Sequence, residues 1–120
     1  MKLKSDPRHL KRAKLIQKLF SWQFRKDKKP PKIIQDIVSN LEEIDKLIAK
    51  SAPDRPIKDI NRIDLAILRL STFELIMDTG IPPKVVIDEA VELGKEFGGN
   101  TSSSFINGAL GQVVKLKKLL

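Results

Sequence analysis

One segment near the middle of the chain, residues 62–79, constrains the fold more than any other. A helix that is apolar nearly all round must be covered by its neighbours. This segment places apolar side chains on almost its whole circumference: Ile63, Leu65, Ala66, Ile67, Leu68, Leu70, Phe73, Leu75, Ile76 and Met77. We therefore predict a central, buried helix. Asn61 and Asp64 are spaced to form a variant capping box at its start, and the main polar strip, expected to be exposed, is Asp64, Ser71 and Asp78.

Two charged side chains, Arg69 and Glu74, interrupt the apolar surface of this central helix. Charges inside a core need partners, because burying an unpaired charge is costly. We therefore expect a structural ion pair between Arg69 and a carboxylate, either Glu74 or Glu89, that joins the central helix to its neighbours.

The other segments also have helical periodicity. Breaks rich in proline, glycine and serine separate four further helices, at about 6–26, 32–50, 83–97 and 102–118, and a short helical piece within 57–60. No window shows strand alternation flanked by hairpin turns. The prediction is an all-α fold: a single domain over residues 1–120, built as a compact bundle of five main helices plus one short helix.

Composition excludes several classes of site. The chain has no cysteine, which excludes a disulfide framework, a thiolate metal site and a cysteine nucleophile, and which suits a reducing compartment. No apolar run is long enough for a membrane span, so we expect a cytoplasmic protein without a membrane partner. The one histidine, His9, has no neighbouring group for a dyad, and we expect a surface or RNA-facing side chain. No enzyme activity, cofactor or metal is predicted.

The positive charge is concentrated at one end. Residues 1–32 contain 12 Lys and Arg against Asp6 and Asp27, whereas the other 88 residues contain 11 against 13 Asp and Glu. Such asymmetry indicates a polyanionic partner such as nucleic acid at the basic end. The alternative is a solvated basic arm that aids solubility.

The first helix combines this charge with an apolar face. Arg8 and Arg12 continue the line of Leu15 and Leu19 past the end of the expected core. Arginine there could hold phosphate or stack on bases through its planar fork, or could pair with carboxylates of a neighbouring helix. The outer stripe of the same helix consists of Lys11, Lys14, Lys18 and Arg25.

The last helix carries an unusual polar face, where Asn107, Gly108 and Gly111 lie away from the apolar stripe. A glycine inside a helix costs about 0.5–1 kcal/mol relative to alanine. Two of them indicate a close approach, either by another helix or by a ligand, and the pattern leaves both open.

Three C-terminal blocks, "IDLAILRLSTFELI" (63–76), "IPPKVVIDEAVELGKEFG" (81–98) and "SSSFINGAL" (102–110), resemble the bacterial transcription antitermination factor NusB family in order and spacing. The start, "RHLKRAKLIQKLFSWQF", is similar to that family's arginine-rich first helix. The resemblance implies a NusB-like, all-helical RNA-binding domain. It would pair with the small-subunit ribosomal protein NusE, bind single-stranded boxA-like RNA, and join the antitermination complex of RNA polymerase.

The resemblance also implies roles for particular residues. The RNA-binding set would be Lys4, Arg8, Lys11, Arg12, Phe105, Asn107 and Gly108. The protein-partner set would be Phe20, where a tyrosine is usual, and Asp64. The sequence departs from the family pattern in three ways: Gly111 stands at a position that is often aspartate, Phe73 replaces a common tyrosine, and the short segment after the first helix leaves no room for a helix that many members have.

Two other functions remain open. The chain could be a helical adaptor that binds only proteins, or a ribosomal RNA assembly factor without a role in antitermination. The same domain also precedes the catalytic domain of certain ribosomal RNA methyltransferases, but a chain ending at Leu120 without a cofactor-binding unit is not expected to be that enzyme. Salt-dependent RNA binding would separate an RNA binder from an adaptor.

Overall fold

The computed structural model describes residues 6–77 and 80–118, and within these ranges all regular structure is helical. The α-helices are α1 (Pro7–Gln23), α2 (Gln35–Ser39), α3 (Leu41–Ser51), α4 (Arg62–Met77), α5 (Pro83–Phe97) and α6 (Ser102–Leu116). Two 3-10 turns, η1 (Lys32–Ile34) and η2 (Ile57–Asp59), precede α2 and α4. The predicted all-α class is confirmed.

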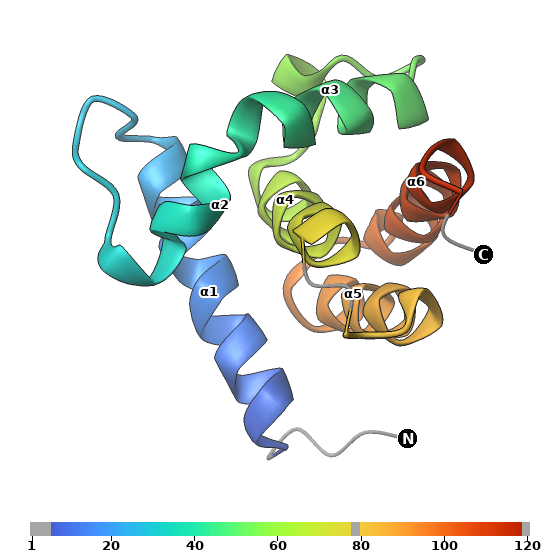
Figure 1. The fold of residues 1–120 in the computed structure, drawn as a ribbon, viewed down its shortest axis with the longest axis horizontal. Coiled ribbons are helices and arrows are strands. Elements are labelled where there is room, and N and C mark those ends of the chain that lie inside the picture. Colours follow the sequence, from blue (N-terminus) through green and yellow to red (C-terminus); the bar gives the residue numbers. More distant parts are fainter. Residues whose placement is uncertain (1–5, 78–79, 119–120) are drawn as a thin grey trace.

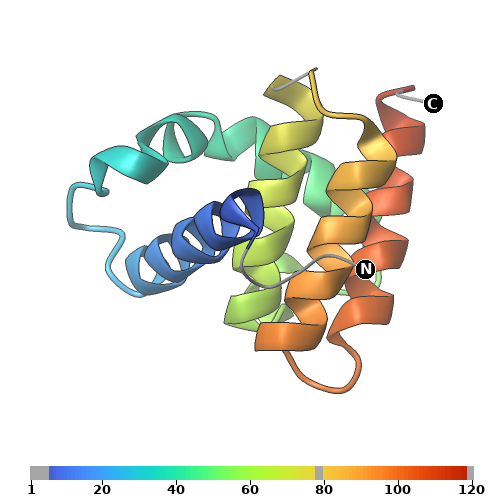
Figure 2. The same ribbon diagram turned by 90° about the horizontal axis from the view of Figure 1, so that it is seen from below.

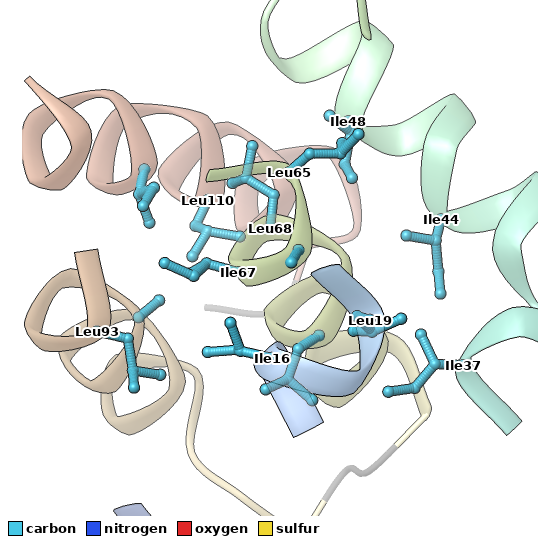
Figure 3. Close-up of a cluster of buried hydrophobic side chains, with 14 of the residues drawn as sticks. Ile16, Leu19, Ile37, Ile44, Ile48, Leu65, Ile67, Leu68, Leu93 and Leu110 are labelled. Atoms are coloured by element: carbon cyan, nitrogen blue, oxygen red, sulfur yellow. The ribbon is translucent and has the colours of Figure 1, made fainter. Parts of the chain in front are cut away.

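The central position of α4 is also as predicted. It packs against α1, α3, α5 and α6, which surround it (Figure 1). Residues Leu65 to Leu70 of α4 are all buried, so no side of this stretch faces solvent. Isoleucine and leucine side chains from the surrounding helices converge on α4 (Figure 3). Trp22 is the one aromatic side chain in the buried apolar core of the described residues, so the core is aliphatic, as the low aromatic content requires.

The helices α5 and α6 lie beside α4 as neighbouring columns, and α1 lies obliquely to them (Figure 2). The α5–α6 contact is close because Gly94 has no side chain: a Cβ atom there would lie 3.0 Å from Ile106 Cδ1. The first helix reaches across to α4 and α5, and its basic N-terminal end therefore rests on the C-terminal half of the chain.

The prediction of one continuous helix over 32–50 is wrong. The segment forms η1, α2 and α3, with a break at Asn40, whose backbone is not helical (φ −107°, ψ 13°). The Asn40 side chain donates a hydrogen bond to the carbonyl oxygen of Asp36 at 2.7 Å, which is the local competition that makes asparagine a poor interior helix residue. Ile37 and Ile44 are buried, as the predicted apolar stripe requires, whereas Ile33 in the 3-10 turn η1 is exposed.

The first helix ends at Gln23, three residues before the predicted end. At the start of α4, Asn61 acts as the cap, because its Oδ1 accepts hydrogen bonds from the backbone N–H groups of Ile63 (2.8 Å) and Asp64 (3.4 Å). The expected exposed strip is wrong, since Asp64 and Ser71 are both buried by the helices around α4. Asp78 lies outside the described residues.

Candidate nucleic-acid interface

The basic end of α1 begins with a cap that also holds a cation. Asp6 Oδ1 accepts from the backbone N–H of Arg8 at 2.8 Å, and Pro7 occupies the first helical position. The Arg8 guanidinium donates to both Asp6 oxygens at 3.3 and 3.2 Å, yet its side chain is 77% exposed. Such an exposed pair is weak, so Arg8 is available for a phosphate. Lys11 is exposed one turn later, and Lys4 lies outside the described residues.

Arg12, by contrast, is buried. Its guanidinium donates to Glu74 of α4, with Nε at 3.1 Å from Oε2 and Nη2 at 3.0 Å from Oε1. Its Nη1 lies 3.8 Å from Glu89 Oε1 of α5. The expectation that Arg12 contacts RNA directly is therefore wrong for this structure, because its planar fork is occupied by a carboxylate. The alternative of a pair with a neighbouring helix is correct for Arg12, which positions α1.

His9 is buried as well, so the expectation of a surface or RNA-facing histidine is wrong. Its Nδ1 lies 3.0 Å from Glu89 Oε1 and its Nε2 lies 2.7 Å from Glu96 Oε2. Ionised carboxylates only accept hydrogen bonds, so both ring nitrogens must donate, which requires the imidazolium form. We call His9, Arg12, Glu74, Glu89 and Glu96 the anchor cluster, because together they tie α1 to α4 and α5.

The contacts of His9 shift its pKa away from the ordinary value. Burial disfavours the charged ring, but the hydrogen bonds and charges of Glu89 and Glu96 outweigh burial and raise the pKa of His9 above its ordinary 6.5. A raised folded-state pKa stabilises the fold fully below the unfolded-state pKa of about 6.5, and this contribution is lost as pH rises through the folded-state value.

We therefore expect the imidazole of His9 to titrate above pH 6.5 in the folded protein and near 6.5 in urea. The chain contains one histidine, so its NMR signal needs no assignment. The melting temperature should fall over the interval in which that signal titrates. A folded-state pKa at or below 6.5 would contradict the doubly hydrogen-bonded imidazolium.

Arg69 does not pair with Glu74 or Glu89, which corrects the expected structural ion pair. Its guanidinium is 1% exposed and donates to Asp45 of α3, from Nε to Oδ1 at 3.0 Å and from Nη2 to Oδ2 at 2.9 Å. Its Nη1 donates to Gln23 Oε1 at 3.0 Å. The need for a carboxylate was correct, but Asp45 of α3 supplies it, whereas Glu74 and Glu89 bond to Arg12 and His9 of α1.

The α6 residues expected to contact RNA lie on two sides of that helix. Asn107 lines a cleft of about 620 Å³ between α5 and α6, together with Ser103, Ser104 and the α5 carboxylates Asp88, Glu89 and Glu92. Glu89 also bonds His9, so this cleft adjoins the basic end of α1. Phe105 and Gly108 instead line a hollow of about 350 Å³ beside residues 51–55, where the Arg55 guanidinium lies 4.1 Å from the Phe105 ring centroid.

The two glycines of α6 are not packed against another helix. A Cβ atom added at Gly108 or Gly111 would meet no atom within 4 Å outside its own helix. Close helix packing, one of the two explanations for these glycines, is therefore excluded within the described residues. The open face leaves space for a ligand.

The expected partner residues are Phe20, in the last turn of α1, and Asp64, in the first turn of α4. Gln23 Nε2 donates to the carbonyl oxygen of Arg62 at 2.9 Å, which joins the end of α1 to the start of α4. Phe20 is partly exposed there and packs edge-on against Phe24, with ring centroids 5.1 Å apart. Asp64 is only 4% exposed, so it offers little surface to a partner.

Among the described residues, no group of three or more His, Cys, Asp and Glu side chains is arranged to hold a metal ion. None of the described helices has the length and apolar character that crossing a membrane requires.

The chain is similar to known proteins both in most of its sequence and in its fold. The sequence pattern of the NusB family matches residues 31–115. The transcription antitermination protein NusB of Acetivibrio thermocellus is 46% identical over 85 residues, which cover 71% of this chain and 59% of that protein. The protein of the same name from Clostridium novyi is 40% identical over 84 residues, 70% of this chain and 63% of that protein. The matched region thus spans about three fifths of these curated relatives.

The three-dimensional comparison extends further along the chain. A crystal form of T. maritima NusB superposes with a TM-score of 0.83 and 30% sequence identity, and the alignment covers 92% of each chain. The sequence match begins after α1 at residue 31, while the structural match covers nearly all of the chain. On both grounds, the chain belongs to the NusB family.

Proposed function

We propose that this chain is an RNA-binding factor of transcription antitermination, which pairs with NusE and binds single-stranded boxA-type RNA in the RNA polymerase antitermination complex. The observation that carries the proposal is the basic end of α1. Arg8 and Lys11 are exposed there, while the anchor cluster fixes the helix beneath them. Cations on a fixed backbone can hold phosphates in one register, which a mobile arm cannot do. The names of the relatives supply the transcriptional context.

The acidic cleft between α5 and α6 limits how an RNA strand could lie across the protein. Asp88 and Glu92 line it and would repel phosphates, although Lys84 and Lys95 pair with them at 3.2 and 3.5 Å. A strand that runs from Arg8 to Asn107 would therefore turn its bases toward α5. Amino groups of bases can donate to carboxylates, as in contacts to cytosine. Gly108 and Phe105 line the other hollow of α6 and lie off this path.

Phe20 is the residue that supports NusE pairing best. It lies in the last turn of α1, so NusE would contact α1 at the opposite end from Arg8 and Lys11. Asp64 is buried, and we assign it a role at the start of α4, where a helix N-terminus favours a carboxylate.

The deciding experiment measures binding to a boxA-type RNA and to a scrambled RNA, with and without NusE, over a range of salt concentrations. We expect preference for the boxA-type RNA and a log–log salt slope of about −0.7 per phosphate contacted. Replacing Arg8 and Lys11 with alanine should weaken binding and flatten the slope by about one to two units. The melting temperature should stay unchanged, since both side chains are exposed.

The matched control replaces Lys50 and Lys58 with alanine, which removes the same charge from exposed positions outside α1. Equal losses from the two pairs would mean that only net charge matters. Binding of NusE without any RNA binding would favour the protein-only adaptor. Binding of RNA without any preference for boxA-type sequence would favour a general ribosomal RNA assembly factor.

A further inference from the structure

We infer that the loop after α1, residues 24–31, is a second RNA-binding surface, which holds single-stranded RNA flanking the segment bound at the basic end of α1. We call these residues the basic loop. The inference rests on the proposed function, because it extends the same strand along α1. The loop projects from the body of the protein at the opposite end of α1 (Figure 1).

The first observation is that the cations of the basic loop are exposed and unpaired. Arg25, Lys26, Lys28 and Lys29 are all exposed, and no carboxylate of the described residues lies within ion-pair distance of any of them. Four other surface lysines each pair with a nearby glutamate or aspartate: Lys46, Lys84, Lys95 and Lys117. Asp27 is the one acidic residue of the basic loop, so the four cations leave a net charge of +3 there, which attracts a polyanion.

The second observation is that the basic loop is tied to the core. The indole Nε1 of buried Trp22 donates to the carbonyl oxygen of Lys28 at 3.1 Å. The backbone N–H of Arg25 bonds to Trp22 at 2.8 Å, and that of Lys28 bonds to Arg25 at 2.9 Å. Gln35 donates to the Pro30 carbonyl at 3.4 Å. The cations therefore stand on a held backbone, which favours repeated phosphate contacts over diffuse attraction.

The third observation is an exposed aromatic ring beside these cations. Phe24 is 62% exposed, and its edge-on contact with Phe20 fixes the orientation of the ring. Proteins bind single strands by combining cations that follow the backbone with aromatic rings on which bases stack. Phe24 followed directly by Arg25 and Lys26 supplies both components.

The spacing along α1 connects the two surfaces. Lys11, Lys14 and Lys18 follow one another at three- and four-residue intervals, so they share one face of α1, and Arg25 follows two residues after the helix ends. The 17 residues of α1 span about 25 Å. An extended strand bound at Arg8 and Lys11 can follow this face to the basic loop, whereas a compact acidic ligand would reach only one end.

The test compares RNAs of different length on the full chain. The probes are a labelled boxA-type RNA of about twelve nucleotides, and the same RNA extended by about ten uridines at its 5′ or its 3′ end, a range set by known single-strand site sizes. We expect one extension to raise affinity about tenfold or more at low salt. The triple variant Lys26→Gln, Lys28→Gln, Lys29→Gln should lose that gain, keep its affinity for the short RNA, and show a salt slope flatter by about two units on the extended RNA.

Two controls separate the basic loop from general charge. The triple variant Lys50→Gln, Lys58→Gln, Lys115→Gln removes the same charge from exposed positions and should retain the gain. Phe24→Ala should reduce the affinity for the extended RNA by about five- to a hundredfold, while Phe24→Trp should keep it. Melting temperatures confirm that each variant is folded.

The outcomes distinguish this inference from the proposed function. Tight binding of the short RNA without any gain from either extension contradicts the inference alone, as does an equal loss of the gain in the two triple variants. If the triple variant of the basic loop keeps the gain in RNA affinity but binds NusE more weakly, the loop contacts the protein partner. That result also overturns the inference. A chain that binds none of the RNAs contradicts the proposed function itself.

Discussion

Replacing Asp45 with alanine is expected to lower the free energy of unfolding by about 3–5 kcal/mol. The change leaves the Arg69 guanidinium, which is 1% exposed, with Gln23 as its remaining hydrogen-bond partner. Removing one partner of a buried ion pair is costly because the other charge stays in a region of low polarity. For a domain of this size, the melting temperature should fall on the order of 10–20 °C, measured by calorimetry or circular dichroism.

Two companion variants show whether the buried charge is the cause. Asp54→Ala removes an exposed carboxylate and should leave the melting temperature nearly unchanged. The double change Asp45→Leu with Arg69→Met removes both charges, so it should recover most of the lost stability. Equal melting temperatures for Asp45→Ala and Asp54→Ala would show that Arg69 does not depend on Asp45.

Replacing Arg12 with leucine is expected to destabilise the protein by a similar amount, about 3–5 kcal/mol, and to weaken RNA binding at the same time. The change removes the cation that lies between Glu74 and Glu89, whose carboxylates are then left with less compensation. The basic end of α1 would lose its strongest attachment to α4, so Arg8 and Lys11 would no longer be held in register.

Comparing variants of Arg8 and Arg12 distinguishes a residue that contacts RNA from one that only positions α1. Arg8→Ala should weaken RNA binding without a change in melting temperature, whereas Arg12→Leu should change both. Arg12→Lys restores a charge but not the planar fork, and it should recover only part of the stability. If Arg12→Leu weakened RNA binding but kept the parent's melting temperature, Arg12 would be a direct contact after all.

The all-α class could be predicted from the sequence, because the spacing of apolar residues indicates which side of each helix is buried. The segment around Leu65–Leu70 has no polar side wide enough to face solvent, which is why α4 is central. The ends of helices and the breaks within them depend instead on side chains that compete for the backbone hydrogen bonds. Asn40 ends α2 through a hydrogen bond to its own preceding turn, a bond that a helical wheel does not reveal.

The partners of buried charges could not be predicted in the same way. The sequence indicates that Arg69 needs a carboxylate, but the choice among Asp45, Glu74 and Glu89 depends on how far each helix is rotated. The burial of His9 could not be predicted from nearby residues, because its partners, Glu89 and Glu96, follow 80 and 87 residues later. The sequence carries one signal of this site: Glu89 and Glu96 are seven residues apart on α5, so they share one face of that helix.

The anchor cluster has a consequence for the order in which the protein assembles. A ribosome adds about 5–20 residues per second. The residues of α1 are therefore synthesised several seconds before Glu74, Glu89 and Glu96. Contacts between such distant parts of a chain also form slowly, because a long loop must close first. The basic end of α1 is therefore synthesised well before the carboxylates that hold it, and it is among the last surfaces to be fixed in place.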